Sequence, residues 1–165
     1  MYALIGTWRM SLEGIEKSLK DLENGKSAAD AMTQTIKEVE DFPYFKSVGY
    51  GGLPNENMEV ELDSAFMDGT NFNFGAVAGV KNIKNPIAVA RDLSKFDANN
   101  FLVGAGAEKY ADQNGFERVN MLTDRAKIHY KNRIYQEKKL AMERDLKPYI
   151  GCLLYTSLSG LARQT

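Results

Sequence analysis

The sequence predicts a mixed α/β fold, and three observations support this prediction. Short apolar runs typical of strands alternate with amphipathic helical patterns, a hairpin signal separates two of these runs, and a glycine-rich loop interrupts the order. Among the 165 residues, 44% are hydrophobic and 26% are charged, values that are ordinary for globular chains and disfavour a disordered or fibrous protein. We therefore expect hairpin strands connected by crossover helices.

The first third of the chain predicts one strand and two helices. Residues 2–5 form a short apolar run, which we interpret as a strand. Apolar residues then recur at helical spacing until Gly25 ends the pattern. Ser27, with an acid three residues later, predicts the capped start of a second helix that ends before Pro43. Residues 47–57 are so rich in glycine and asparagine that we expect a sharply turning loop there.

The middle of the chain carries the hairpin signal. Residues 60–67 and 72–80 are strand-like runs. The intervening residues 68–71 include Gly69 and Asn71, which tolerate the positive φ angles of a tight hairpin. The sequence therefore predicts an antiparallel pair.

The rest of the pattern predicts a short strand and three helices. Residues 101–103 form the strand. The first helix begins after Asn85-Pro86, the second runs from about Gly104 to Asn114, and the third runs from Thr123 to about Asp145. Residues 147–151 are interpreted as an extended linker that ends at Gly151. Residues 152–165 are rich in Leu, Ser and Thr, lack acidic residues and show no clear period, so they do not predict another element.

Composition argues against several classes of protein. The net charge is -1, so the protein as a whole has no positive electrostatic potential that would attract nucleic acid or an anionic membrane. We therefore expect neither as a partner. Single copies of Cys152 and His129 exclude an internal disulfide and are too few for a zinc site, so no metal or other cofactor is expected. The sequence has neither an apolar run of membrane-spanning length nor a visible signal peptide. Because the N-terminus can be truncated, the compartment stays open.

Three weaker patterns favour ordinary structural interpretations. Gly104-Ala105-Gly106 resembles the start of a dinucleotide fingerprint, but Lys109 occupies the third glycine position. The last predicted helix is rich in basic residues, which favours a solvated helix face over a nucleic-acid footprint. His129 has no carboxylate at catalytic spacing, so a surface or half-buried imidazole is favoured over a general base.

The glycine loop carries a more particular pattern. Residues 41–55 resemble the corresponding loop of the glycosylasparaginases, also called N4-(β-N-acetylglucosaminyl)-L-asparaginases. Neighbouring blocks are similar to the same family in order and separation, and they comprise Gly6-Thr7-Trp8 and residues 23–31, 60–69, 75–78 and 83–91. The resemblance extends from residue 2 to about Gly151.

This resemblance implies a fold and a chemistry. It implies that residues 1–151 are the α-subunit portion of a four-layer αββα sandwich of the N-terminal nucleophile hydrolase type, made as a precursor that cleaves its own backbone before a threonine. The free amine of that threonine serves as the base for its hydroxyl. The enzyme would hydrolyse the side-chain amide of a small asparagine-derived substrate to aspartate and an amine. Plain L-asparagine and isoaspartyl peptides remain alternative substrates, and the α-subunit would pair with a β-subunit in a heterodimer that assembles further.

Two residues of this sequence match substrate-site positions of the family. Trp8 matches the tryptophan that walls the substrate pocket, and Ser47 matches the serine near the nucleophile's amine. The alternatives are a core aromatic for Trp8 and a turn serine that bonds its own backbone for Ser47. Gly49, Gly51 and Gly52 are expected to satisfy backbone geometry only.

The chain departs from the family just after Gly151, where the resemblance implies the nucleophilic threonine. The family has a His-Asp-Thr sequence at this point, whereas this chain has Cys152-Leu153-Leu154, so no catalytic residue is assigned and the chain is predicted to be inactive alone. Thr156, Thr165 and Cys152 lack the context of a nucleophile. The tail from Cys152 resembles a translated adapter sequence, which suggests that residues 152–165 are not native. A noncatalytic ligand-binding module and an interaction protein using the basic helix remain alternative functions.

Overall fold

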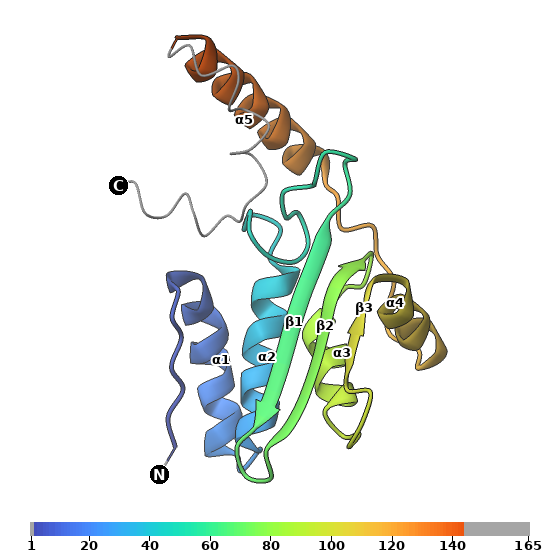
Figure 1. The fold of residues 1–165 in the computed structure, drawn as a ribbon. Coiled ribbons are helices and arrows are strands. Elements are labelled where there is room, and N and C mark those ends of the chain that lie inside the picture. Colours follow the sequence, from blue (N-terminus) through green and yellow to red (C-terminus); the bar gives the residue numbers. More distant parts are fainter. Residues whose placement is uncertain (1, 144–165) are drawn as a thin grey trace.

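The computed structural model describes residues 2–143 and confirms a mixed α/β fold (Figure 1). The elements in chain order are η1 (Arg9–Ser11), α1 (Leu12–Glu23), α2 (Ala28–Asp41), β1 (Glu61–Asp68), β2 (Asn73–Lys81), α3 (Pro86–Leu93), β3 (Phe101–Val103), α4 (Gly104–Gln113) and α5 (Asp124–Glu143). Predicted residues 144–145 of the last helix, the linker that ends at Gly151 and the tail 152–165 lie outside the described residues.

The first two long helices form an antiparallel pair. α2 begins as the sequence predicts, since Ser27 Oγ accepts a hydrogen bond from the Asp30 backbone N–H at 3.1 Å. The helices approach closely at Gly14, where an added Cβ would lie 2.7 Å from the Thr35 carbonyl oxygen. Thr35 Oγ1 in turn lies 2.9 Å from the buried Ser18 hydroxyl. Gly14 and Ser18 of α1, which both contact Thr35 of α2, therefore set the close spacing of this pair.

The three strands form one sheet in the order β1-β2-β3. β1 and β2 are antiparallel, whereas β3 runs parallel to β2. The register shifts beyond Leu62, and here Asp63 Oδ1 accepts a hydrogen bond from the Gly79 N–H at 2.7 Å. Gly79 has a φ of +60°, a value that suits a glycine at a β-bulge. The predicted hairpin and the short third strand are thus both confirmed.

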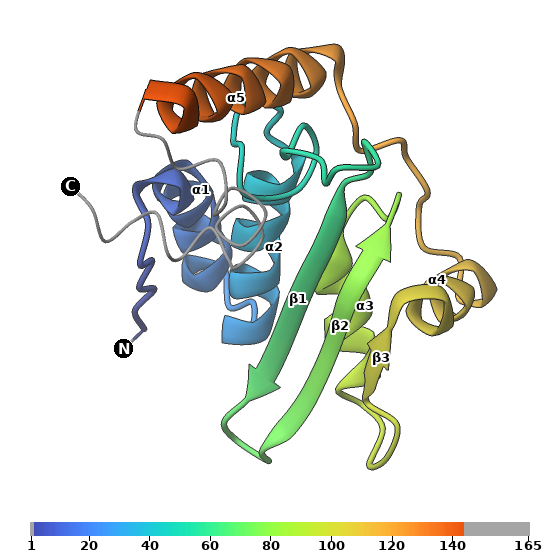
Figure 2. The same ribbon diagram turned by 45° about the horizontal axis from the view of Figure 1, so that its top comes forward.

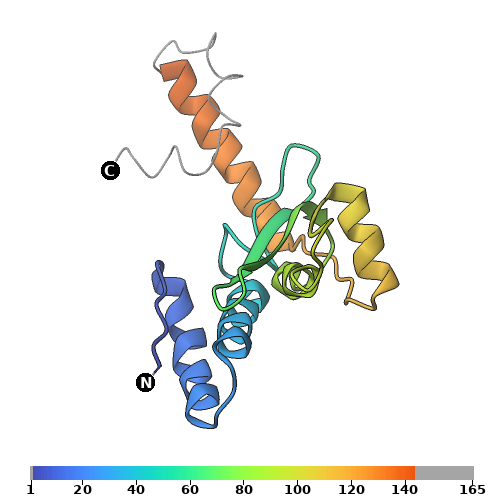
Figure 3. The ribbon, with the colours of Figure 1, turned by 60° about the horizontal axis from the view of Figure 1, so that its bottom comes forward.

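The core lies between the sheet and α3, which packs against β1 and β2 in Figure 3. Gly75 permits this contact, because a Cβ at that position would clash with the backbone of α3 at Ala90 and Ser94. The main core cluster joins the sheet to α3, α4 and the segment before α5, and it contains Val60, Leu62, Val77, Val80, Ile83, Val89, Leu93, Ala107, Ala111 and Met121. A second cluster, Phe66, Ile87 and Ala90, connects the sheet to α2.

The opposite face of the sheet is apolar and exposed. Met67 pairs with Phe74 across β1 and β2, and Phe101 and Val103 continue the same face on β3. These four side chains are between 40% and 59% exposed. Antiparallel sheets with a solvated face normally carry polar side chains on it. This face therefore has the character of an interior surface.

Two local predictions are wrong. Residues 2–5 form no strand, because none of the described strands pairs with them; Ile5 is 93% exposed. A strand needs hydrogen-bonding neighbours, and an apolar run alone does not supply them. In the β1–β2 turn, the residue with positive φ is Phe72, at +60°, and Gly69 is not among the residues with positive φ.

Candidate functional site

The two predicted site residues lie at one end of the α1/α2 pair. Trp8 precedes η1, which packs against α2, and Ser47 lies six residues beyond the C-terminus of α2. Because α1 and α2 are antiparallel, the start of one and the end of the other meet at the upper end of the pair in Figure 1. The fold therefore brings both residues to the same end of the molecule.

Trp8 is a surface residue within the described chain. Its side chain is 61% exposed, which contradicts the alternative of a core aromatic. Its backbone is held at the start of η1, where the Trp8 carbonyl accepts hydrogen bonds from the Ser11 hydroxyl at 2.7 Å and the Ser11 N–H at 3.1 Å. A fixed backbone with a free indole suits a pocket wall that another element completes.

Backbone contacts shape the glycine loop around Ser47. Gly49 has a φ of +61° and lies against the backbone of Glu40, so that no side chain fits there. The loop closes on itself through a 2.8 Å hydrogen bond from the Leu53 N–H to the Lys46 carbonyl. The Gly51 N–H donates to the Met121 carbonyl at 2.9 Å, which ties the loop to the segment before α5. The glycines thus serve backbone geometry, as predicted.

Ser47 is exposed on this closed loop. Within residues 2–143 its hydroxyl makes no hydrogen bond, so the structure gives no support to the alternative of a serine that bonds its own turn. A hydroxyl that no local group uses is free to contact a ligand or a further part of the protein.

Glu40, whose backbone carbonyl accepts a 2.7 Å hydrogen bond from the Tyr50 N–H of the loop, carries a buried carboxylate that sequence reasoning missed. Glu40 is 3% exposed, and its carboxylate accepts hydrogen bonds from the Ile87 N–H at 3.2 Å and from Asn85 Nδ2 at 3.3 Å. Burial raises the pKa of Glu40 to about 8; the negative Asp41 adds to the rise, whereas the two hydrogen bonds and Lys37 oppose it. Glu40 therefore joins α2 to the start of α3. Its position near the end of a predicted helix gave no sequence signal of burial.

Aromatic and basic side chains surround the outer part of the loop. Phe42 contacts Tyr44 and Phe45 with ring centroids 5.5 and 4.7 Å apart. The Arg125 guanidinium lies 4.5 Å from the Tyr44 ring centroid, so the first turn of α5 packs on the loop. His129, one helical turn later, is half-buried as the sequence favours. Figure 2 shows α5 running across the top of the molecule above this loop.

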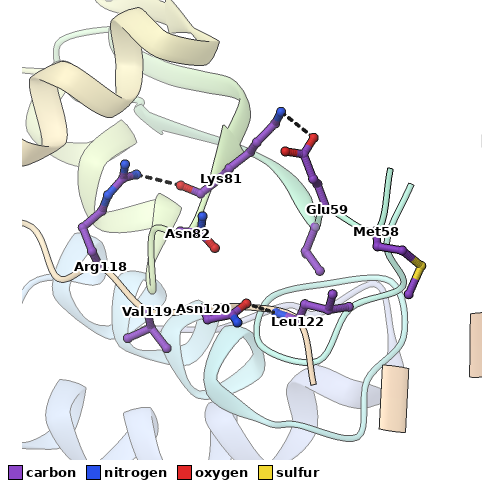
Figure 4. A pocket seen from close by; sticks show the side chains of 9 residues that line it. Met58, Glu59, Lys81, Asn82, Arg118, Val119, Asn120 and Leu122 are labelled. Carbon is purple, nitrogen blue, oxygen red and sulfur yellow. Dashed lines mark hydrogen bonds and ion pairs between the residues drawn. The ribbon is translucent and has the colours of Figure 1, made fainter. Parts of the chain in front are cut away.

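A pocket of about 470 Å³ with mixed polar and apolar lining lies beside the end of the sheet, as Figure 4 shows. Lys81 Nζ contacts Glu59 at 2.7 Å, and Arg118 Nη1 donates to the Lys81 carbonyl at 2.7 Å. The remaining lining residues are Met58, Val60, Asn82, Val119, Asn120 and Leu122. Neither Trp8 nor Ser47 lines it. The lining contains no serine, threonine or cysteine, and both Lys81 and Arg118 are engaged in the contacts just described.

The described residues, 2–143, contain no group of three or more histidine, cysteine, aspartate or glutamate side chains placed to hold a metal ion. None of the helices in that range is long and apolar enough to cross a membrane.

The predicted position of the missing nucleophile lies beyond this range. Gly151, after which the family resemblance implies the threonine, is outside the described residues, so the structure does not test this prediction. The same holds for Cys152, Thr156 and Thr165, the positions considered as alternative nucleophiles. The absence of the threonine after Gly151 therefore rests on the sequence, in which Cys152-Leu153-Leu154 follows.

Comparison with known proteins places these features in a family. The sequence model of a family described as asparaginase matches residues 8–152. The chain belongs to the asparaginase family. It is 39% identical over 128 residues to the N(4)-(beta-N-acetylglucosaminyl)-L-asparaginase of Elizabethkingia miricola, a match that covers 78% of this chain and 37% of that protein. The glycosylasparaginase resemblance is thus confirmed, and the family is one of hydrolases.

Relatives with other activities in their names match almost as well. The chain is 37% identical over 127 residues to the isoaspartyl peptidase/L-asparaginase of Mus musculus, covering 75% of this chain and 37% of that protein. It is 39% identical over 117 residues to the plant-type L-asparaginase of Pyrococcus horikoshii, covering 68% and 38%. The chain therefore spans somewhat more than a third of the length of these relatives.

Proposed function

We propose that this chain is the α-subunit portion of an autoprocessing amidohydrolase that cleaves the side-chain amide of an asparagine-derived substrate. Glycosylasparagine is the preferred candidate, because Trp8 and the glycine loop resemble that branch and the Elizabethkingia miricola relative carries that name. The names of the other relatives keep L-asparagine and isoaspartyl peptides as alternatives. The observation that carries the proposal is the convergence of Trp8 and Ser47 at one end of the helical pair.

The exposed sheet face supports the proposal that a second half completes the fold. Met67, Phe74, Phe101 and Val103 present an apolar surface of the kind that packs against another sheet. A second sheet on this face would give the four-layer sandwich, with α3 and α4 as one outer layer. The added half would also supply strand neighbours for residues 2–5, which lack them among the described strands.

Each site residue then has a defined role. The exposed indole of Trp8 forms one wall of the substrate pocket, and the Ser47 hydroxyl bonds the amine of the threonine nucleophile, which the second half supplies from the position just after Gly151. The amine takes the proton of the threonine hydroxyl as that oxygen attacks the amide carbon. Backbone donors stabilise the tetrahedral oxyanion, the amine product leaves, and water releases aspartate from the acyl-enzyme.

The first test is the sequence of intact genomic DNA across the codon for Gly151. Continuation into His-Asp-Thr supports the proposal, whereas a reproduced Cys-Leu-Leu tail contradicts it. We call the gene product that continues past Gly151 into His-Asp-Thr the uninterrupted protein. It should cleave itself into two subunits, visible by mass spectrometry, and should hydrolyse an aspartyl anilide. The 165-residue chain should do neither, and turnover by this pure chain would overturn the assignment.

Variants of the uninterrupted protein test the site. Trp8→Ala should lower kcat/KM by about tenfold, because it removes the pocket wall. Phe72→Ala is the matched control, since Phe72 is another exposed aromatic, at 77%, on the hairpin tip at the far end of the molecule in Figure 1. Ser47→Ala should slow turnover more than it changes KM. Equal effects of Trp8→Ala and Phe72→Ala would show that Trp8 has no particular role.

A further inference from the structure

Three basic side chains lie where the start of α5 packs on the glycine loop, although they come from distant parts of the sequence. Lys46 precedes Ser47 in the glycine loop, whereas Arg125 and His129 lie one turn apart on α5. The pKa of His129 is lowered, first by loss of surrounding water and then by the positive charges of Lys46 and Arg125. The geometry agrees with this coupling, because the Arg125 guanidinium lies 4.5 Å from the ring centroid of Tyr44, two residues before Lys46 in the loop.

The Tyr44 ring fixes one of these groups. The Arg125 guanidinium carbon lies 4.5 Å from the ring centroid, a distance typical of a cation–π contact. Tyr44 itself rests against Phe42, which follows directly on α2. An arginine held on an aromatic ring keeps in-plane N–H groups available, and these donors match the two oxygens of a carboxylate.

The backbone fixes a second group. The Lys46 carbonyl accepts the Leu53 N–H at 2.8 Å, so Lys46 stands at the closed neck of the loop. Its side chain and that of Arg125 are exposed. The backbone that carries the cluster is therefore fixed, whereas the charged ends of Lys46 and Arg125 are accessible to a ligand.

Within the described part of the chain, no carboxylate neutralises the positive charge of this cluster. None of the three residues forms an ion pair with a described residue, and the nearest acid in sequence, Asp124, is bound to Lys127 at 2.8 Å. Other basic groups of the body have partners, as in the contacts of Lys81 with Glu59 and of Arg118 with Glu108. A local excess of positive charge with fixed donors is suited to an anion.

We propose that Lys46, Arg125 and His129 form a subsite for a carboxylate on the leaving-group side of the substrate. The identity of the substrate rests on the function proposed above, whereas the anion-binding property rests on the cluster alone. The subsite lies next to Ser47, at the end of the molecule that holds Trp8. A substrate with an acidic leaving group, such as a β-aspartyl peptide with an acidic second residue, would contact both places.

The single histidine of the chain provides a direct test. NMR titration of the His129 ring protons can be followed in the full 165-residue chain with β-aspartyl-glutamate and with its uncharged isostere β-aspartyl-glutamine. We expect the acidic dipeptide to shift the His129 resonances and to raise the His129 pKa, because a bound carboxylate favours the charged imidazole. Its affinity should exceed that of the amide on the order of tenfold. Equal responses to the two dipeptides would overturn the proposal.

Matched variants locate the effect. Lys46→Gln and Arg125→Gln should each reduce the preference for the acidic dipeptide, and together they should abolish it. Lys127→Gln on the same helix should retain it, because Lys127 is already paired with Asp124. Circular dichroism of each variant establishes that the fold is intact. An acidic preference that survives the double substitution would place the anion elsewhere and refute the subsite.

Two more measurements separate this proposal from the proposed function. Glucuronate compared with glucose shows whether a sugar carboxylate is accepted as well as a peptide carboxylate. In the uninterrupted protein, the ratio of kcat/KM for the acidic and amide dipeptides should fall by about tenfold in the double variant. If His129 discriminates the ligands while no amide is hydrolysed, the subsite stands and the proposed function fails. If the uninterrupted protein hydrolyses amides but does not distinguish the acidic dipeptide from the amide dipeptide, the proposed function stands and the subsite is refuted.

Discussion

Glu40 makes the stability of this protein depend on pH in a window where few other groups titrate. Its carboxylate is almost fully buried, and burial raises its pKa from 4.5 to about 8. Between these values the folded chain keeps the proton while the unfolded chain has lost it. The free energy of unfolding therefore falls as pH rises through this window.

The magnitude follows from the size of the window. The full interval from 4.5 to about 8 corresponds to about 5 kcal/mol of unfolding free energy. His129 acts in the opposite direction, because its lowered pKa costs stability as pH falls below its ordinary value of 6.5. Between about pH 6.5 and pH 8 the Glu40 contribution alone amounts to about 2 kcal/mol.

Glu40→Gln isolates this contribution. The amide keeps an oxygen for the Ile87 N–H but does not ionise. We expect urea denaturation of the variant, followed by circular dichroism, to give an unfolding free energy that changes little from about pH 6.5 to pH 8. The wild-type chain should lose about 2 kcal/mol over the same range. The two chains should therefore differ in the slope of stability against pH.

Glu16→Gln is the control, because Glu16 is an exposed residue of α1 with no ion pair in the described part of the chain. This variant should retain the wild-type pH dependence. If Glu40→Gln retained it too, the carboxylate would be ionised in the folded state at neutral pH, and the reasoning from burial would be refuted.

Three further predictions concern packing and capping. Gly75→Ala should destabilise the fold by about 3 kcal/mol, measured by urea denaturation, because the new methyl group clashes with the α3 backbone; Gly106→Ala, with open space around it, is its control. Ser27→Ala should cost about 1 kcal/mol in the same assay, since it removes the cap of α2; an unchanged midpoint would show that the cap is dispensable. Phe101→Lys should reduce self-association of the isolated chain in sedimentation experiments and should prevent assembly of the uninterrupted protein. Normal assembly would show that the exposed sheet face is not an interface.

Local chemistry allowed much of the fold to be predicted. The cap at Ser27, the proline at the start of α3 and the glycine after α4 act on their own neighbours in the chain, so their effects are visible in the sequence. The hairpin of β1 and β2 was predictable for the same reason. Residues 2–5 were not, because a strand depends on partners that an apolar run does not reveal.

The candidate site was also predicted in part from the sequence and in part only from the structure. Its two residues, Trp8 and Ser47, came from resemblance to a family, and the structure adds that they lie at one end of the α1/α2 pair with both side chains exposed. Their roles, and the threonine expected after Gly151, stay predictions until the uninterrupted protein and its variants are measured. The burial of Glu40 could not be predicted from the sequence, because an acidic residue near the end of a helix is usually exposed.

The sequence by itself thus determined the family, the order of the helices and strands after residue 5, and the glycines of the loop at residues 49–52. Tertiary structure alone decided which distant groups meet. It buried Glu40 against the start of α3, and it placed Arg125 of α5 on Tyr44 of the glycine loop. The physical reason is that burial and electrostatic coupling depend on distance in space, which the chain sets only after it has folded.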